Sequence, residues 1–226
     1  MHRDDRPEPF IRDRLTFLAY GMTIAFGFTV AMLGPAMPLL RDDLGISRAV
    51  GGLHFTSLAF GSVVAGFVIE RVIRAWGRHR IFWLGGLGLV MGSLLLATGM
   101  HPAMTVVGAL IIGTSGTATL TVGQATLSDH HASRRATALT EINTAMSFGS
   151  VLTALFIGAA VTIGLGWRPV VGVPVAIFIT LAIARRTQAF PPPSGMDVSQ
   201  EPRRLPAGYW FYWAALAPSV GAEWSI

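Results

Sequence analysis

The protein has 226 residues but no cysteine and no lysine, so all 17 of its basic residues are arginine. The absence of cysteine excludes disulfide bonds and cysteine-ligated metal sites. Charged residues make up only 13% of the chain, about half of the roughly 25% found in soluble domains, which leaves too little polar surface for a water-soluble globule. The sequence also lacks a His-Glu-x-x-His motif, a Gly-x-Ser-x-Gly elbow and a phosphate loop. We therefore expect no catalytic residues, no cofactor and no metal.

Apolar runs dominate what is present. Six of them lie at roughly 15–40, 49–70, 80–100, 103–127, 136–162 and 167–184, and a seventh begins near Tyr209. A bilayer core about 30 Å thick is crossed by about 20 helical residues. The runs must be helical because lipid offers no hydrogen-bond partner to an unpaired backbone group. The sequence thus predicts an all-α polytopic protein embedded in the lipid bilayer, in line with its mean hydropathy of +0.55.

The arginines are distributed unevenly between the two sides of these runs. If the N-terminus lies inside, 14 arginines are cytoplasmic and only Arg41, Arg48 and Arg168 are outside. The positive-inside rule then predicts a multi-pass protein of the cell inner membrane with a cytoplasmic N-terminus. The net charge of +5 indicates no nucleic-acid partner, because the basic residues form short clusters rather than one continuous face.

Composition divides the chain into four parts. Three consecutive prolines from Pro191 begin a polar stretch typical of a linker, and the last apolar run reaches Ile226 without a polar flank, so we expect a truncated chain. The predicted parts are a cytoplasmic tail at 1–14, a six-helix transmembrane bundle at 15–186, a cytoplasmic linker at 187–207 and an incomplete seventh transmembrane helix at 208–226.

A faint internal repeat relates the first three runs to the next three at an offset of 87 residues. The first loop of one unit lies outside and the matching loop of the other lies inside. Three-helix units of opposite topology are the inverted repeats of secondary transporters. We therefore predict a bundle built from two inverted repeats, followed by the start of a second bundle.

Three loops resemble those of the major facilitator superfamily. Residues 34–47 are similar to the proline-containing exit of the family's first helix and the short acidic loop after it. Residues 66–80 are similar to the signature Gly-x-x-x-Asp-Arg-x-Gly-Arg-Arg/Lys, with Glu70 in place of the aspartate and four extra residues after Arg71. Residues 129–136 resemble the family's acidic-then-Arg-Arg-x-Ala loop.

This resemblance implies a secondary active transporter that moves a small-molecule substrate by alternating access, with the proton as a candidate coupling ion. It also implies a cytoplasmic gating loop that biases one of two states through charge pairs. The residues of this loop are Gly66, Glu70, Arg71, Gly77, Arg78, Arg80, Asp129 and Arg135. Residues 111–116 lack the fourth-helix arginine of drug/proton antiporters, so drug efflux is not implied. Two alternatives stay open, a membrane scaffold or receptor without transport activity and a membrane-embedded enzyme.

Two acidic side chains lie within apolar runs, where a charge costs about 2.5–3.5 kcal/mol on insertion scales and is functional by default. Glu141 lies in the fifth run with Asn143 nearby, and Glu223 lies in the seventh. We interpret Glu141, Asn143 and Glu223 as candidate cavity or coupling residues. The alternatives are an ion pair of Glu141 with Arg134 or Arg135, and a structural pairing of Glu223 between the two halves.

Overall fold

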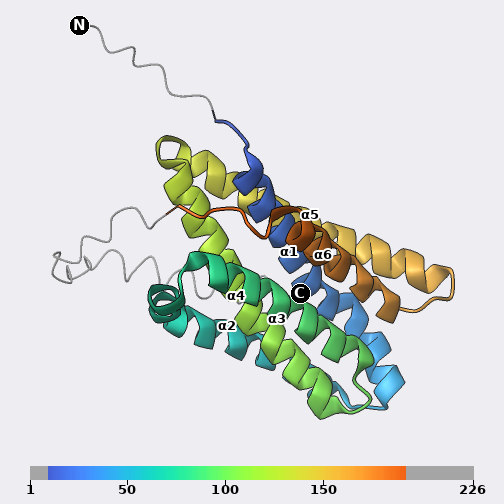
Figure 1. Ribbon diagram of the computed structural model, residues 1–226. Helices are drawn as coiled ribbons and strands as arrows, with labels where there is room; N and C mark the ends of the chain where they lie inside the picture. The colour runs from blue at the N-terminus through green and yellow to red at the C-terminus, as the bar shows by residue number, and fades with distance from the viewer. Residues whose placement is uncertain (1–9, 192–226) are drawn as a thin grey trace, which may run out of the picture. The chain divides into compact units, whose positions relative to one another are not determined.

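The computed structural model describes residues 10–191, and these form six α-helices joined by short connections (Figure 1). The described residues contain no strand, so the prediction of an all-α polytopic fold is confirmed. The run near Tyr209 and most of the predicted linker lie outside the described residues, and the division into four parts stays a prediction. The helices are α1 (Arg14–Leu44), α2 (Arg48–Trp76), α3 (Arg78–Thr98), α4 (Pro102–His130), α5 (Arg135–Thr162) and α6 (Gly172–Arg185).

The described residues hold six helical segments that are long and apolar enough to cross a membrane, the fifth and sixth of which, Ala132–Thr162 and Arg168–Arg185, each begin with a 3₁₀ turn. Several differ in length from the apolar runs, because polar residues continue a helix until a glycine ends it. The first helix reaches Leu44 and stops at Gly45, whose φ of +62° is a left-handed conformation that suits glycine. The second helix reaches Trp76 and stops at Gly77, with φ +81°. The expected loop after the second run is therefore a single-glycine joint.

The sixth run is divided rather than continuous. It begins with a short 3₁₀-helix, η2 (Arg168–Val171), and only then continues as α6. Another 3₁₀ turn, η1 (Ala132–Arg134), separates α4 from α5. Trp167 at the start of η2 is buried and donates a hydrogen bond through Nε1 to Asp43 Oδ2 at 3.2 Å, which ties this connection to the end of α1.

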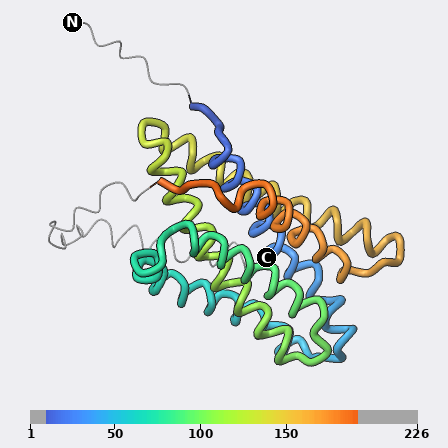
Figure 2. The backbone as a smooth tube through the Cα atoms, viewed as in Figure 1, coloured from blue at the N-terminus to red at the C-terminus, as the bar shows by residue number. Residues whose placement is uncertain are grey.

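The helices pack as two groups around the central pair α1 and α4. Helix α1 packs mainly on α5 and α6, helix α4 packs mainly on α2 and α3, and the two central helices contact each other. The tube in Figure 2 shows these groups, with the blue α1 beside the yellow α5 and the orange α6, and the green α3 and α4 beside the teal α2. The side chains of Met22, Phe28 and Met32 in α1 are fully buried, so the core is centred on this helix.

Glycines at equivalent places let the backbones approach closely. A Cβ added to Gly149 of α5 would lie 2.2 Å from the carbonyl oxygen of Ile24 in α1, and one added to Gly61 of α2 would lie 2.4 Å from that of Leu110 in α4. Small residues permit such contacts in membrane helices. The two glycines are 88 positions apart, close to the repeat offset of 87. The packing of α5 on α1 thus repeats that of α2 on α4, as the internal repeat predicts.

Candidate functional site

Most ion pairs of the described bundle lie at one end, where α1, α3 and α5 begin and α2, α4 and α6 end. We call this the N-side end. An ion pair here joins the first residue of α3 to α4, with Arg78 Nη1 donating to Asp129 Oδ2 at 2.6 Å. The two side chains are only 11% and 14% exposed. The pair is therefore largely removed from water, and it fixes the start of α3 against the end of α4.

A second network joins the residues before α1 to α5. Arg12 makes a bidentate ion pair with Glu141, in which Nε donates to Oε2 at 2.9 Å and Nη2 donates to Oε1. The hydroxyl of Tyr20 in α1 donates to Glu141 Oε2 at 2.5 Å. The hydrogen bonds between Arg12 and Glu141 and the negative charge of Glu141 raise the pKa of Arg12 above its usual value. The partner of Glu141 is therefore Arg12, not the neighbouring arginines that the sequence suggested.

A third network lies beside the second and involves Asp13, the N-cap of α1. Its Oδ1 accepts from the Thr16 amide at 2.9 Å and from the Thr16 hydroxyl at 2.8 Å, while its Oδ2 lies 2.8 Å from His130 Nε2. His131 Nε2 lies 2.9 Å from Thr16 Oγ1. The network thus connects the start of α1 to the end of α4.

The pKa values of two groups in this network are shifted. Partial burial of Asp13 would raise its pKa, but the hydrogen bonds from Thr16 and from His130 outweigh burial and lower it. Burial and the neighbouring His130 lower the pKa of His131, although Asp13 and Glu141 oppose the shift. Both shifts favour an ionised aspartate beside a neutral imidazole, a combination of side chains that can ligate a metal ion.

The remaining predicted gating residues are spread over open surface. Glu70 and Arg71 lie in the last turns of α2 rather than in a loop. Glu70 pairs at 3.3 Å with Arg74 one turn later, and both side chains are exposed, so this pair contributes little. A Cβ added to Gly66 meets nothing within 4 Å, and Gly77 forms the joint before α3. The remaining three residues are all exposed: Arg71, Arg80 and Arg135.

A polar surface runs along α5 and extends to α4. Gln124 Nε2 of α4 donates to Asn143 Oδ1 at 3.1 Å, and Asn143 Nδ2 donates to the carbonyl of Leu139 at 2.8 Å. Asn143 is exposed in the described bundle, and so are the hydroxyl residues on the same side of α5: Thr140, Thr144 and Ser147. An exposed amide in a membrane helix indicates a surface that faces water or protein rather than lipid. Glu223, the other candidate, lies outside the described residues.

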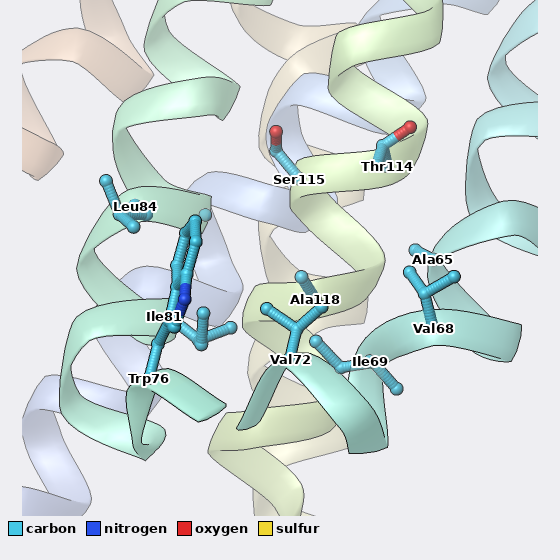
Figure 3. Close-up of a pocket in the computed structure, with 11 residues that line it drawn as sticks. Ala65, Val68, Ile69, Val72, Trp76, Ile81, Leu84, Thr114, Ser115 and Ala118 are labelled. Carbon is cyan, nitrogen blue, oxygen red and sulfur yellow. The ribbon is translucent and has the colours of Figure 1, made fainter. Parts of the chain in front are cut away.

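An apolar groove of about 200 Å³ lies between α2, α3 and α4 (Figure 3). Trp76, Ile69 and Leu84 border it, and the Ser115 and Thr114 hydroxyls lie at one end. None of the residues predicted for gating or coupling lines this groove. Its apolar walls suit hydrocarbon, whereas the polar surface of α4 and α5 suits a hydrated solute.

The sequence did not identify several members of these networks. Arg12 and Asp13 looked like tail residues because they precede the first apolar run. Tyr20 is an ordinary residue of a membrane helix, and His130 with His131 ends the fourth. Only the position of these residues in the sequence could have indicated their contacts. Each lies at or near a helix end, and short connections bring these ends to the same side of the bundle.

Comparison with known proteins agrees with this architecture. The family model described as the Major Facilitator Superfamily matches residues 19–220. Among curated proteins, the chain is 29% identical to plastidic glucose transporter 4 of Arabidopsis thaliana over 174 residues, which cover 76% of this chain and 31% of that protein. The aligned part of this chain therefore spans about a third of that relative's length.

Proposed function

Because this chain belongs to the major facilitator superfamily, we propose that it is the substrate-binding half of a secondary active transporter that works by alternating access. The family match confirms the resemblance noted in its loops, and the six apolar helices make it a multi-pass membrane protein. Membership of this family favours a transporter over the enzyme and scaffold alternatives. The similar protein from Arabidopsis thaliana is a glucose transporter by name, so a monosaccharide is the first substrate class to test.

The observation that carries the proposal is the polar surface formed by Gln124 and Asn143. Side-chain amides donate to and accept from hydroxyl groups, which are the groups a sugar presents. Asn143 lies eight residues after Arg135, the start of α5, so it lies about 12 Å from the N-side end. Substrate sites in such folds lie near the middle of the membrane at the interface between repeats. This surface is the wall that we assign to the substrate cavity.

Chemical labelling tests the cavity directly, because the chain has no cysteine of its own. Asn143→Cys in membranes should react with a charged, water-soluble thiol reagent, since its side chain faces water in the proposal. Leu87→Cys is the matched control. Leu87 is 45% exposed and lies about 13.5 Å into α3. It belongs to an apolar surface, so it should face lipid and stay unreactive.

Substrate protection then tests the solute. D-glucose should slow the labelling of Asn143→Cys, and L-glucose at the same concentration should not. Equal reactivity at Leu87 and Asn143 would refute the water-filled cavity. If no monosaccharide slows the labelling of Asn143→Cys, the proposal that the substrate is a sugar is wrong.

Two parts of the proposal concern orientation and gating. The 14 to three division of arginines supports a cytoplasmic N-side end in the cell inner membrane.

The Arg78–Asp129 pair then lies at the cytoplasmic side, where it would stabilise one of two states. Arg78→Gln should change the transport rate more than the substrate affinity. A large loss of affinity at an unchanged rate would contradict this role. We keep the proton as the candidate coupling ion, with Glu141 its candidate carrier.

A further inference from the structure

Asp13, His130 and His131 form a cluster that the proposed transport function does not use. Each residue offers one ligand atom, and these atoms lie within 4.8 Å of one another. The sequence predicts no metal site, because Asp13 lies 117 positions from His130 and matches no ligand spacing. The fold brings them together by placing the start of α1 beside the end of α4.

We propose that Asp13, His130 and His131 bind one divalent transition-metal ion, and that Zn²⁺ suits this donor set. Two imidazoles and one carboxylate are ligands that Zn²⁺ accepts, with a fourth position left for water. Zinc lies about 2.0–2.2 Å from such ligands, so tetrahedral donors are roughly 3.3 Å apart. The cluster is close to this spacing, since His130 Nε2 lies 2.8 Å from Asp13 Oδ2 and all three ligand atoms lie within 4.8 Å of one another.

A buried hydroxyl orients two of the three ligands. Thr16 is fully buried, and its Oγ1 lies 2.8 Å from Asp13 Oδ1 and 2.9 Å from His131 Nε2. The Thr16 hydroxyl donates to Asp13 Oδ1, so it accepts from His131 Nε2–H, and Nδ1 is the nitrogen of His131 that is left to ligate the ion. A hydrogen bond from the other ring nitrogen of a histidine fixes the orientation of the ligand. The cluster is therefore held from the protein side by a residue whose position the helix packing sets.

The cluster is open on its other side. Asp13, His130 and His131 line a polar pocket of about 250 Å³ together with Ser133 and Arg134. The pocket admits the ion and leaves room for water in the open coordination position. The charge of Arg134 opposes a cation, so we expect a dissociation constant on the order of micromolar, weaker than that of structural zinc sites.

A bound ion would connect the two central helices. Asp13 caps α1, His130 is the last residue of α4, and His131 follows it. The ion would hold the N-side ends of these helices together and restrain any movement between them.

Calorimetric titration of Zn²⁺ into the purified full chain, free of any polyhistidine tag, tests the site. We expect one ion per chain, with affinity reduced at least tenfold in Asp13→Asn, His130→Gln and His131→Gln. Asparagine preserves the N-cap of α1, so Asp13→Asn removes the ligand charge without removing the cap. His79→Gln is the control, because His79 lies at the same end and its Nε2 contacts the carbonyl of Arg186 instead.

Substitutions of Thr16 give a second test of the site. Thr16→Val should weaken Zn²⁺ binding by about 10–100-fold, and Thr16→Ser should restore it. Helical circular dichroism and gel-filtration profiles that match those of the unaltered chain show that each variant is folded. Absence of Zn²⁺ binding to the unaltered chain would overturn the proposal. Unchanged affinity in any one of the three ligand variants, or a loss of binding in His79→Gln, would also overturn it.

Discussion

Replacing Gly149 by alanine tests the close packing of α5 on α1. The added Cβ would lie 2.2 Å from the carbonyl oxygen of Ile24, about 1 Å less than van der Waals contact allows. The atom it meets belongs to the backbone, so rotation of a side chain cannot relieve the clash. The two helices must separate by about this distance, and a gap of 0.5–1 Å forfeits a quarter to a half of each dispersion contact.

The expected destabilisation is about 1–3 kcal/mol, the range for overpacked cores. At about 2–4 °C per kcal/mol for a chain of this size, the melting temperature should fall by roughly 2–12 °C. The assay is thermal unfolding in detergent, followed by circular dichroism at one fixed scan rate, because membrane-protein unfolding is often irreversible.

Gly158→Ala is the matched control on the same helix. A Cβ at Gly158 meets nothing within 4 Å, and alanine is the better helix former, so this variant should be as stable as the unaltered chain or slightly more stable. Gly113→Ala should behave like Gly149→Ala, because its Cβ would lie 2.0 Å from the carbonyl of Leu58 in the equivalent α2–α4 contact. Equal melting temperatures for Gly149→Ala and Gly158→Ala would refute the reasoning.

Other perturbations test the N-side end. Arg78→Gln should lower the free energy of unfolding by about 1.5–3 kcal/mol, because it removes a charged hydrogen bond. Arg74→Gln breaks only an exposed ion pair and should cost less than about 0.5 kcal/mol. Equal shifts in melting temperature for the two variants would contradict this expectation. Tyr20→Phe should cost about 1.5 kcal/mol by removing a donor to Glu141, and an unchanged melting temperature would show that this hydrogen bond contributes nothing. A cysteine at Gln188 should resist periplasmic thiol labelling in intact cells, and labelling there would reverse the proposed orientation.

The helical type of the described bundle and its six helices were predictable because the membrane restricts the choices. With few charges and long apolar runs, helices are the structures that satisfy the backbone in lipid. The helix ends were less predictable. The second run was expected to end at Glu70, with Arg71 in the loop after it, but nothing in the solvated last turns of α2 stops the helix before Gly77.

The candidate site was predictable only in part. Arg78 and Asp129 were both expected in a charged latch, and the structure shows them paired. The partners of Glu141 were not expected, since Arg12 is 129 positions away and belongs to no motif. A pairing of this kind depends on which helix ends become neighbours, and charge spacing along the chain carries no such information.

The sequence by itself determined that this protein is a bundle of membrane helices, because composition and run length decide whether a segment can cross a bilayer. It also indicated the repeat, whose offset relates one helix-packing contact to another. Only the tertiary structure decided which polar groups meet. Glycines let α5 pack closely on α1 and α2 on α4, and the arrangement of the helices brings Asp13 to His130 and Arg12 to Glu141. Distance along the chain does not limit such contacts, because antiparallel helices return distant residues to the same end.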